Sequence, residues 1–147
     1  MAGLVDVAEP EPALSQMASA FARLYLANSA QRVAFAHTLT APSATRLLLP
    51  YLPEEAAREA TRRAWQAAAG LYVLYGDPRL VACAPAPRAE PGQLAERAEP
   101  AELAERAVAN GAAHSIKLTE ACLREEGVSR DPILLRAARD AAESMHG

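Results

Sequence analysis

The chain contains few of the residues that mark specialised protein classes. Of its 147 residues only 5% are aromatic, and only two are cysteines. Cys83 and Cys122 form no CxxC pair, so we expect no disulfide framework and a reducing compartment, the cytoplasm. Cys122 falls within a helical pattern as an ordinary small core residue. Cys83 falls in a loop, where a single cysteine is weak evidence for a nucleophile.

Several binding motifs are also missing. The sequence has no GxGxxG after a strand, no Walker loop, no HExxH, no pair of Glu-x-x-His motifs for a di-iron bundle and no Gly-x-Ser-x-Gly, so it carries no flavin, heme or metal motif. The formal net charge is −3 without a basic patch, which argues against a nucleic-acid partner. The apolar runs are shorter than the roughly 20 residues of a membrane span, and the N-terminus does not resemble a secretory signal.

What is present favours helices. Hydrophobic residues make up 51% of the chain, and much of this is alanine, the best helix former. β-branched residues are sparse, and no alternating run is long enough for a strand. We predict an all-α fold, a compact array or bundle of six to eight helices. Residues 1–11 are predicted to be a disordered lead, and residues 12–147 a single helical domain with a proline-rich loop at 77–92.

Capping signals and apolar spacing predict where the helices lie. Ser29 is expected to cap a short second helix, and Thr40 with Pro42 is expected to begin a new one. The longest helix should end at Gly76. The predicted helices are residues 12–28, a short helix after Ser29, a helix from Thr40 to Pro50, and helices over 53–75, 91–109 with a break at Pro100, 113–126 and 131–145.

Three residues stand out as candidates for chemistry. His114 and Lys117 are three positions apart on one predicted helix and share a face, so they could bind an anionic phenolate or enolate. The simpler interpretation is a partly buried histidine beside a surface pair of Lys117 with Glu120, which we favour from spacing alone. His37, at a predicted helix junction, could act as acid or base or could be a structural histidine.

The aromatic residues of the longest predicted helix allow two interpretations. Trp65, Tyr72 and Tyr75 could line a planar aromatic pocket, or they could be the bulky part of a core built from small residues. We favour the core interpretation for Trp65. For the two tyrosines both interpretations stay open, since a buried hydroxyl needs a hydrogen-bond partner.

Two segments of the chain contain several distinctive short motifs. The first contains His37-Thr-Leu-Thr40, Ala44-Thr-Arg46-Leu-Leu-Leu-Pro50-Tyr-Leu, Trp65-Gln and Leu71-Tyr72-x-x-Tyr75-Gly76. The second contains His114-Ser-Ile-Lys117-Leu-Thr119-Glu120-Ala-Cys-Leu and Asp131-Pro132-Ile-Leu-Leu-x-Ala-Ala. These two segments resemble the C-terminal half of the questin-oxidase-like family. They occur in the family's order and cover roughly residues 30–76 and 105–142.

The resemblance implies an oxidoreductase of secondary metabolism. The namesake of the family opens an anthraquinone ring by a Baeyer–Villiger-type monooxygenation that uses NADPH and oxygen. The expected substrate is therefore an aromatic polyketide or quinone-like small molecule. His37 and His114 would transfer protons and Lys117 would stabilise an oxyanion, while Thr40, Arg46, Trp65, Tyr72 and Tyr75 would contact the substrate.

The sequence also departs from the family. Family members are considerably longer, and their N-terminal half carries further histidines, so we expect a homodimer or a partner chain to supply that half. Acidic residues usually precede the family's His-x-x-Lys element, whereas this chain has Ala112 and Ala113. The alternative is a non-catalytic helical binding or scaffold protein derived from that family.

Overall fold

The computed structural model describes residues 9–77 and 99–145, and nearly all of these residues are helical. Within these ranges there are six α-helices, two short 3-10 turns and no β-strand, so the prediction of an all-α array is confirmed. None of the helices described is long and apolar enough to cross a membrane. Cys83, His146 and most of the predicted loop at 77–92 lie outside the described ranges.

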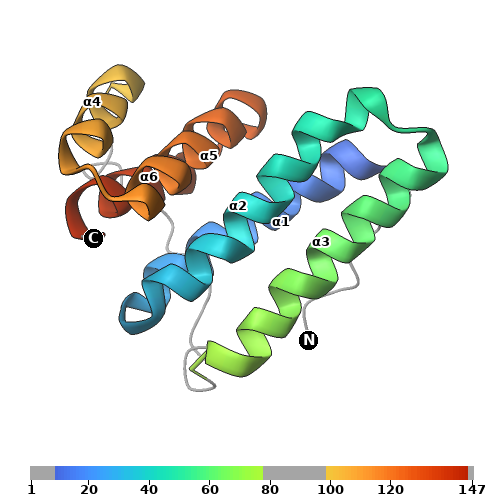
Figure 1. Cartoon of the computed structure of the whole chain (residues 1–147), viewed down its shortest axis with the longest axis horizontal. Helices are drawn as coiled ribbons and strands as arrows, with labels where there is room; N and C mark the ends of the chain where they lie inside the picture. The colour runs from blue at the N-terminus through green and yellow to red at the C-terminus, as the bar shows by residue number, and fades with distance from the viewer. Residues whose placement is uncertain (1–8, 78–98, 146–147) are drawn as a thin grey trace.

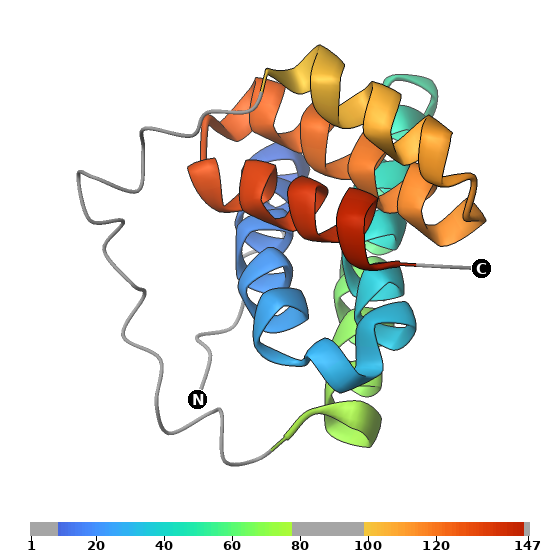
Figure 2. The ribbon, with the colours of Figure 1, turned by 90° about the vertical axis from the view of Figure 1, so that its left-hand side faces the viewer.

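The helices form two groups (Figure 1). The first group is α1 (Pro10–Ala27), α2 (Arg32–Leu48) and α3 (Glu54–Tyr75), and the second is α4 (Pro100–Asn110), α5 (Ala113–Ser129) and α6 (Pro132–Ser144). The 3-10 turns Ser29–Gln31 and Leu49–Tyr51 flank α2. Figure 2 shows the second group lying across the first. Helices α1 and α2 contact α5 and α6, and the core lies at this junction.

The core combines a few large side chains with many alanines. Its largest fully buried members come from both groups: Tyr25, Phe35, Leu14, Met17, Leu39, Leu103, Leu118 and Leu134. Helix α6 contributes mostly small residues, among them Ala137, Ala138 and Ala141, each 0% exposed. Small residues let helix axes approach closely, so α5 and α6 can pack tightly against each other.

Three predicted helix ends are confirmed. The Gly76 amide donates to the Tyr72 carbonyl at 2.8 Å and closes α3. Gly111 ends α4 with a φ of 76°, a left-handed conformation that glycine adopts without the steric cost of a Cβ. Asp131 caps α6, because its side chain accepts a hydrogen bond from the Ile133 amide at 3.0 Å.

The first helix starts earlier than predicted. Helix α1 begins at Pro10, so residues 10 and 11 do not belong to a disordered lead. A proline at the first helical position loses no hydrogen bond, because that amide has no partner within the helix. The Glu9 carbonyl accepts from the Ala13 amide at 3.2 Å and starts the helical pattern.

The prediction of a new helix start at Thr40 is wrong. Helix α2 runs without a break from Arg32 through Pro42, which is buried inside it. Proline there removes one helical bond, to the Thr38 carbonyl. The packing of α2 against α1, α3 and α5 outweighs this local cost. Ser29 also differs from the prediction, since it lies in a 3-10 turn and makes no side-chain cap.

Helix α5 runs past its predicted end. It continues through Gly127 to Ser129 and stops at Arg130, which takes the left-handed conformation with a φ of 57°. An interior glycine costs a helix only about 1 kcal/mol, which packing can offset. The stop is set instead by Pro132, because a residue that precedes proline, here Asp131, disfavours the helical conformation.

Candidate functional site

The structure brings the two candidate histidines together. His37 on α2 and His114 in the first turn of α5 have ring centroids 5.4 Å apart, with ring planes at 90°. The His37 side chain is exposed, and His114 is half-buried. Two residues from separate sequence motifs are thus neighbours at the surface between the two helix groups.

Buried polar contacts hold the two helices that carry the histidines. Arg46 on α2 donates to both carboxylate oxygens of Glu125 on α5, over 2.9 to 3.1 Å, and to the Ser15 hydroxyl at 2.9 Å. Arg124 on α5 donates to the buried Ser43 hydroxyl of α2 at 2.9 Å. These bonds fix the position of α2 against α5, and with it the separation of the imidazoles.

A second polar cluster anchors the start of α2. Arg32 forms a two-bond ion pair with Asp140 of α6, with both N–O distances at 2.9 Å, and Tyr25 donates its hydroxyl to Asp140 at 2.7 Å. The hydrogen bond from Arg32 holds the pKa of Asp140 below its ordinary value. Burial, followed by the contact with Asp140, raises the pKa of Tyr25 well above its ordinary value. The cluster joins α1, α2 and α6.

Lys117 lies one turn beyond His114 and is exposed. It is the only lysine in the sequence, and every other basic side chain apart from the histidines is an arginine. The simpler interpretation from sequence paired Lys117 with Glu120. The structure instead pairs Glu120 with Arg124 at 3.1 Å, and no ion pair of Lys117 is found within the described ranges.

Arg46 has a different role from the one predicted. The resemblance implied that it contacts substrate, but its guanidinium is occupied by Glu125 and Ser15, and its side chain is only 11% exposed. A charged group in such an environment needs this partner and cannot leave it cheaply. Thr40 is half-buried and lies one turn after His37 on α2, so it stays a candidate for substrate contact.

The aromatic residues of α3 are not joined to the histidines by any ring contact described. Tyr72 packs edge-on against Phe35, with centroids 6.4 Å apart, and Phe35 is fully buried while His37 is exposed. Trp65 is partly buried against the core. Tyr75 is 48% exposed at the end of α3. The core interpretation therefore fits Trp65 and extends to Tyr72, which packs on the buried Phe35.

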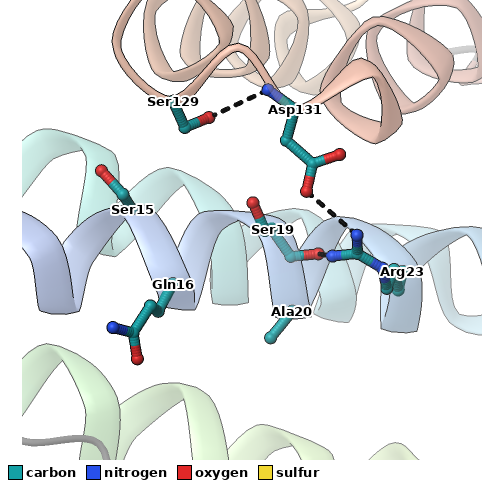
Figure 3. A pocket seen from close by; sticks show the side chains of 7 residues that line it. All are labelled: Ser15, Gln16, Ser19, Ala20, Arg23, Ser129 and Asp131. Carbon is teal, nitrogen blue, oxygen red and sulfur yellow. Dashed lines mark hydrogen bonds and ion pairs between the residues drawn. The ribbon is translucent and has the colours of Figure 1, made fainter. Parts of the chain in front are cut away.

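A shallow cavity of about 390 Å³ lies elsewhere, between α1 and the start of α6 (Figure 3). Across it Arg23 donates to Asp131 at 3.0 Å, and within α1 Arg23 also donates to the Ser19 carbonyl at 2.8 Å. Burial opposes the ionisation of Asp131, but the Ile133 amide, Ser19 and Arg23 keep its pKa below the ordinary value. These groups satisfy one another, so they fasten α6 to α1 and leave no free charge for a ligand. The lining residues are Ser15, Gln16, Ser19, Ala20, Arg23, Ser129 and Asp131.

The histidine pair has a limited set of chemical capacities. Two neighbouring imidazoles can pass a proton between them, and a nearby ammonium can hold an anion. They could also each donate one nitrogen to a transition-metal ion, leaving its other positions to ligands from elsewhere. The described residues hold no group of three histidine, cysteine, aspartate or glutamate side chains suited to a metal. Ala112 and Ala113 provide no carboxylate to orient His114.

The sequence reasoning missed the acidic partners in these clusters. Glu125 follows Leu118, Ala121 and Cys122 on the buried face of α5, and a charge on such a face signals a buried ion pair. That signal was available from the spacing alone. Ser115 had no such signal: its hydroxyl is buried and lacks a hydrogen-bond partner among the residues described.

Comparisons with known proteins found no similar protein. No family model, no curated protein and no solved structure matches the chain. A functional assignment therefore depends on the sequence motifs and on the geometry of the histidine pair.

Proposed function

We propose that the chain is an oxidoreductase-type domain that acts on an aromatic polyketide or quinone-like small molecule. In this proposal His37 and His114 transfer protons and Lys117 stabilises a phenolate or enolate oxyanion. The observation that carries it is the 5.4 Å separation of the two imidazole rings, which belong to distant motifs of the sequence. A scaffold without chemistry has no need for these two residues to meet.

The single lysine supports the role given to position 117. An arginine side chain is charged at all ordinary pH values, whereas a lysine amine is a compact charge that can also release a proton. Every ion pair found within the described ranges uses arginine, and the one lysine lies one turn from His114 without an ion-pair partner there. An anion bound there would gain a charge-assisted hydrogen bond.

The proposed reaction is a Baeyer–Villiger-type monooxygenation. One atom of O₂ is inserted between the carbonyl carbon and a neighbouring ring carbon, and the other leaves as water. NADPH supplies the two electrons and, with one proton from solvent, balances the reaction. The imidazoles would take the phenol proton and return one to the leaving oxygen, and Lys117 would hold the charge that develops on the carbonyl oxygen.

The exposure of the site supports a second chain. His37 and Lys117 are exposed and His114 is half-buried, so water reaches all three. Electrostatic stabilisation of an oxyanion is much stronger where water is excluded. We propose that a second copy or a partner chain covers the histidine pair during the reaction.

Turnover of a hydroxyanthraquinone tests the proposal. The measurement is the coupled consumption of NADPH and O₂, made with and without added divalent metal ions, and with the ring-opened product identified by mass. His37→Gln, His114→Gln and Lys117→Met should each lower kcat by about 100-fold. Arg63→Met, on an exposed face of α3, serves as the control and should turn over normally.

Lys117→Arg separates two roles for the lysine. If only positive charge is needed, this variant should keep much of the activity that Lys117→Met loses. If the amine itself moves a proton, both variants should be equally slow. Full activity in all three site variants, with folding unchanged, would rule out the mechanism and leave the non-catalytic binding or scaffold protein as the better description.

A further inference from the structure

Helix α2 exposes a row made of apolar residues and one histidine, which we call the outer strip. It consists of Val33, His37, Ala41, Ala44 and Leu48, which are spaced three or four positions apart and so lie on one helix face. Val33 is 50% exposed and Leu48 is 55% exposed. Both alanines and the histidine are exposed as well. The strip contains the imidazole of the proposed site.

The charged residues of α2 point the other way. Arg32 is bound by Asp140, and Arg46 by Glu125, whose side chain is only 1% exposed. A surface helix of a single globular chain normally turns its apolar stripe inward and its charges to water. In α2 the inner face is apolar too, with Phe35 and Leu39 fully buried. The helix therefore has apolar residues on two faces, as a helix packed on both sides does.

We propose that the outer strip of α2 is the interface of a homodimer in which two α2 helices pack antiparallel. A two-fold axis between residues 40 and 41 sets Val33 against Leu48 of the partner subunit, and His37 against Ala44 of the partner subunit. Side-chain size follows a similar order along the strip in both directions, with large residues at the ends and alanines near the middle. The alanines let the two helix axes approach closely, and the large residues then meet at the ends.

Charge favours a second copy over an unrelated partner. The strip carries no acidic or basic group apart from the histidine, so a charged partner would bury its charge without a counter-ion there. The partner surface should therefore lack acidic side chains, lysine and arginine. The outer strip of a second copy, packed antiparallel, is such a surface. A two-fold contact of this kind uses the same surface on both copies. It therefore produces a closed dimer and does not propagate into a filament.

The dimer would also change the surroundings of the proposed site. The partner subunit's Leu48 and the partner subunit's Ala44 would lie over the face of α2 that bears His37, and would displace water from the imidazole. The inference goes beyond the proposed function, because the dimer can form whether or not the chain is an enzyme. Association and turnover can therefore fail separately.

The strip is short, which limits the strength of association. From Val33 to Leu48 it extends about 22 Å at 1.5 Å per residue. A standard stable interface uses about 20–30 residues on each side, many more than this strip supplies. We expect a dimer that dissociates in the micromolar range.

Sedimentation equilibrium from micromolar to millimolar concentration tests the proposal. The unaltered chain should shift from monomer to dimer. Ala41→Glu places two carboxylates beside the two-fold axis and should weaken association at least about tenfold. Circular dichroism should show unchanged helix content, because Ala41 is exposed on a helix that accepts glutamate.

Two matched variants locate the interface. Leu74→Glu changes another exposed apolar cluster, at the end of α3, where Leu74 is 74% exposed, and Ala104→Glu changes an exposed alanine of α4. Both should dimerise normally. A chain that stays monomeric throughout, or one whose dimer survives Ala41→Glu or breaks on Leu74→Glu, overturns the proposal.

Cross-linking tests the antiparallel arrangement. In a Cys83→Ser chain, Ala41→Cys should oxidise to a disulfide-linked dimer, because residues beside a two-fold axis of packed helices lie within disulfide range. Ala104→Cys should not. A dimer in solution whose Ala41→Cys variant fails to cross-link has another arrangement and contradicts the proposal.

Discussion

The Glu125 carboxylate accepts hydrogen bonds from Arg46 on both of its oxygens while the Glu125 side chain is only 1% exposed. This ion pair joins the two helices that carry the candidate histidines. Removing one member would leave the other charge buried without a counter-ion, at a cost of about 3–5 kcal/mol. We therefore expect Glu125→Ala to lower the free energy of unfolding, measured by urea denaturation, by that amount.

Two controls separate this effect from a general loss of charge. Glu59→Ala removes the helix-surface partner of Arg62 and Arg63, which are 55% and 71% exposed, and should change stability by less than about 1 kcal/mol. The double variant Arg46→Leu with Glu125→Leu should be more stable than either single variant, because it leaves no unpaired charge. A double variant as unstable as the sum of the two singles would contradict this account.

Acid should weaken the attachment of α2 to α6 through Asp140. Its pKa in the folded chain lies below the ordinary value, because Arg32 and Tyr25 donate to the carboxylate. The unfolded chain then binds the proton at a higher pH, near the ordinary value of about 3.9. The stabilisation is complete above that pH and is lost as the pH falls through the lower pKa of the folded state.

Urea denaturation at pH 6 and pH 3 measures this dependence. The unaltered chain should lose stability over that interval, and Asp140→Asn should lose less, because its starting stability no longer includes the carboxylate. Asp131→Asn, at the cap of α6, should behave in the same way, since the pKa of Asp131 is also lowered. An equal acid response in all three chains would show that other carboxylates carry it.

The sequence predicted the helical class and several helix ends because these depend on local chemistry. Gly111 takes a left-handed φ and Asp131 accepts the Ile133 amide, and both effects act within a few residues. Pro42 shows where local reasoning fails. Its signal for a helix start is real, but α2 packs against three other helices, and that contact outweighs one missing backbone bond.

In the candidate site, too, features that depend on residue type could be predicted, and features that depend on distant contacts could not. The histidines could be selected by residue type, and the structure places His37 and His114 together. The family resemblance implied a substrate contact for Arg46, whereas its partner in the structure lies 79 positions along the chain. A single sequence cannot show that Glu125 is the residue that pairs with Arg46. A glutamate on an apolar helix face does indicate that some cationic side chain pairs with it.

Cys122 should be inert in the folded chain. Its side chain is fully buried, and burial followed by the nearby Glu125 charge raises the pKa of its thiol well above the ordinary value. The thiolate is the reactive form, so a disulfide reagent should react with it only through unfolding. In a Cys83→Ser chain we expect the reaction of Cys122, measured by the thiol that the disulfide reagent releases, to be slow in buffer and rapid in urea. Rapid reaction in buffer would mean that α5 opens readily around Cys122.

Asn28 should hold the ends of α1 and α3 together. Its side-chain amide donates to the Leu24 carbonyl at 2.7 Å, and its carbonyl oxygen accepts from the Asp77 amide at 3.1 Å. Asn28 is only 6% exposed, so losing both bonds should cost about 1–3 kcal/mol. We expect Asn28→Ala to show this loss in urea denaturation.

Hydrogen exchange at the Asp77 amide distinguishes the two bonds of Asn28. Asn28→Asp keeps an oxygen that can accept from Asp77 but removes the donor to Leu24. Exchange at Asp77 should therefore stay slow in Asn28→Asp and become fast in Asn28→Ala, while amides in the middle of α3 keep their protection in both. If Asp77 exchanges equally fast in both variants, the Asn28 side chain does not fasten the end of α3, and the packing of Tyr72 on Phe35 must hold it instead.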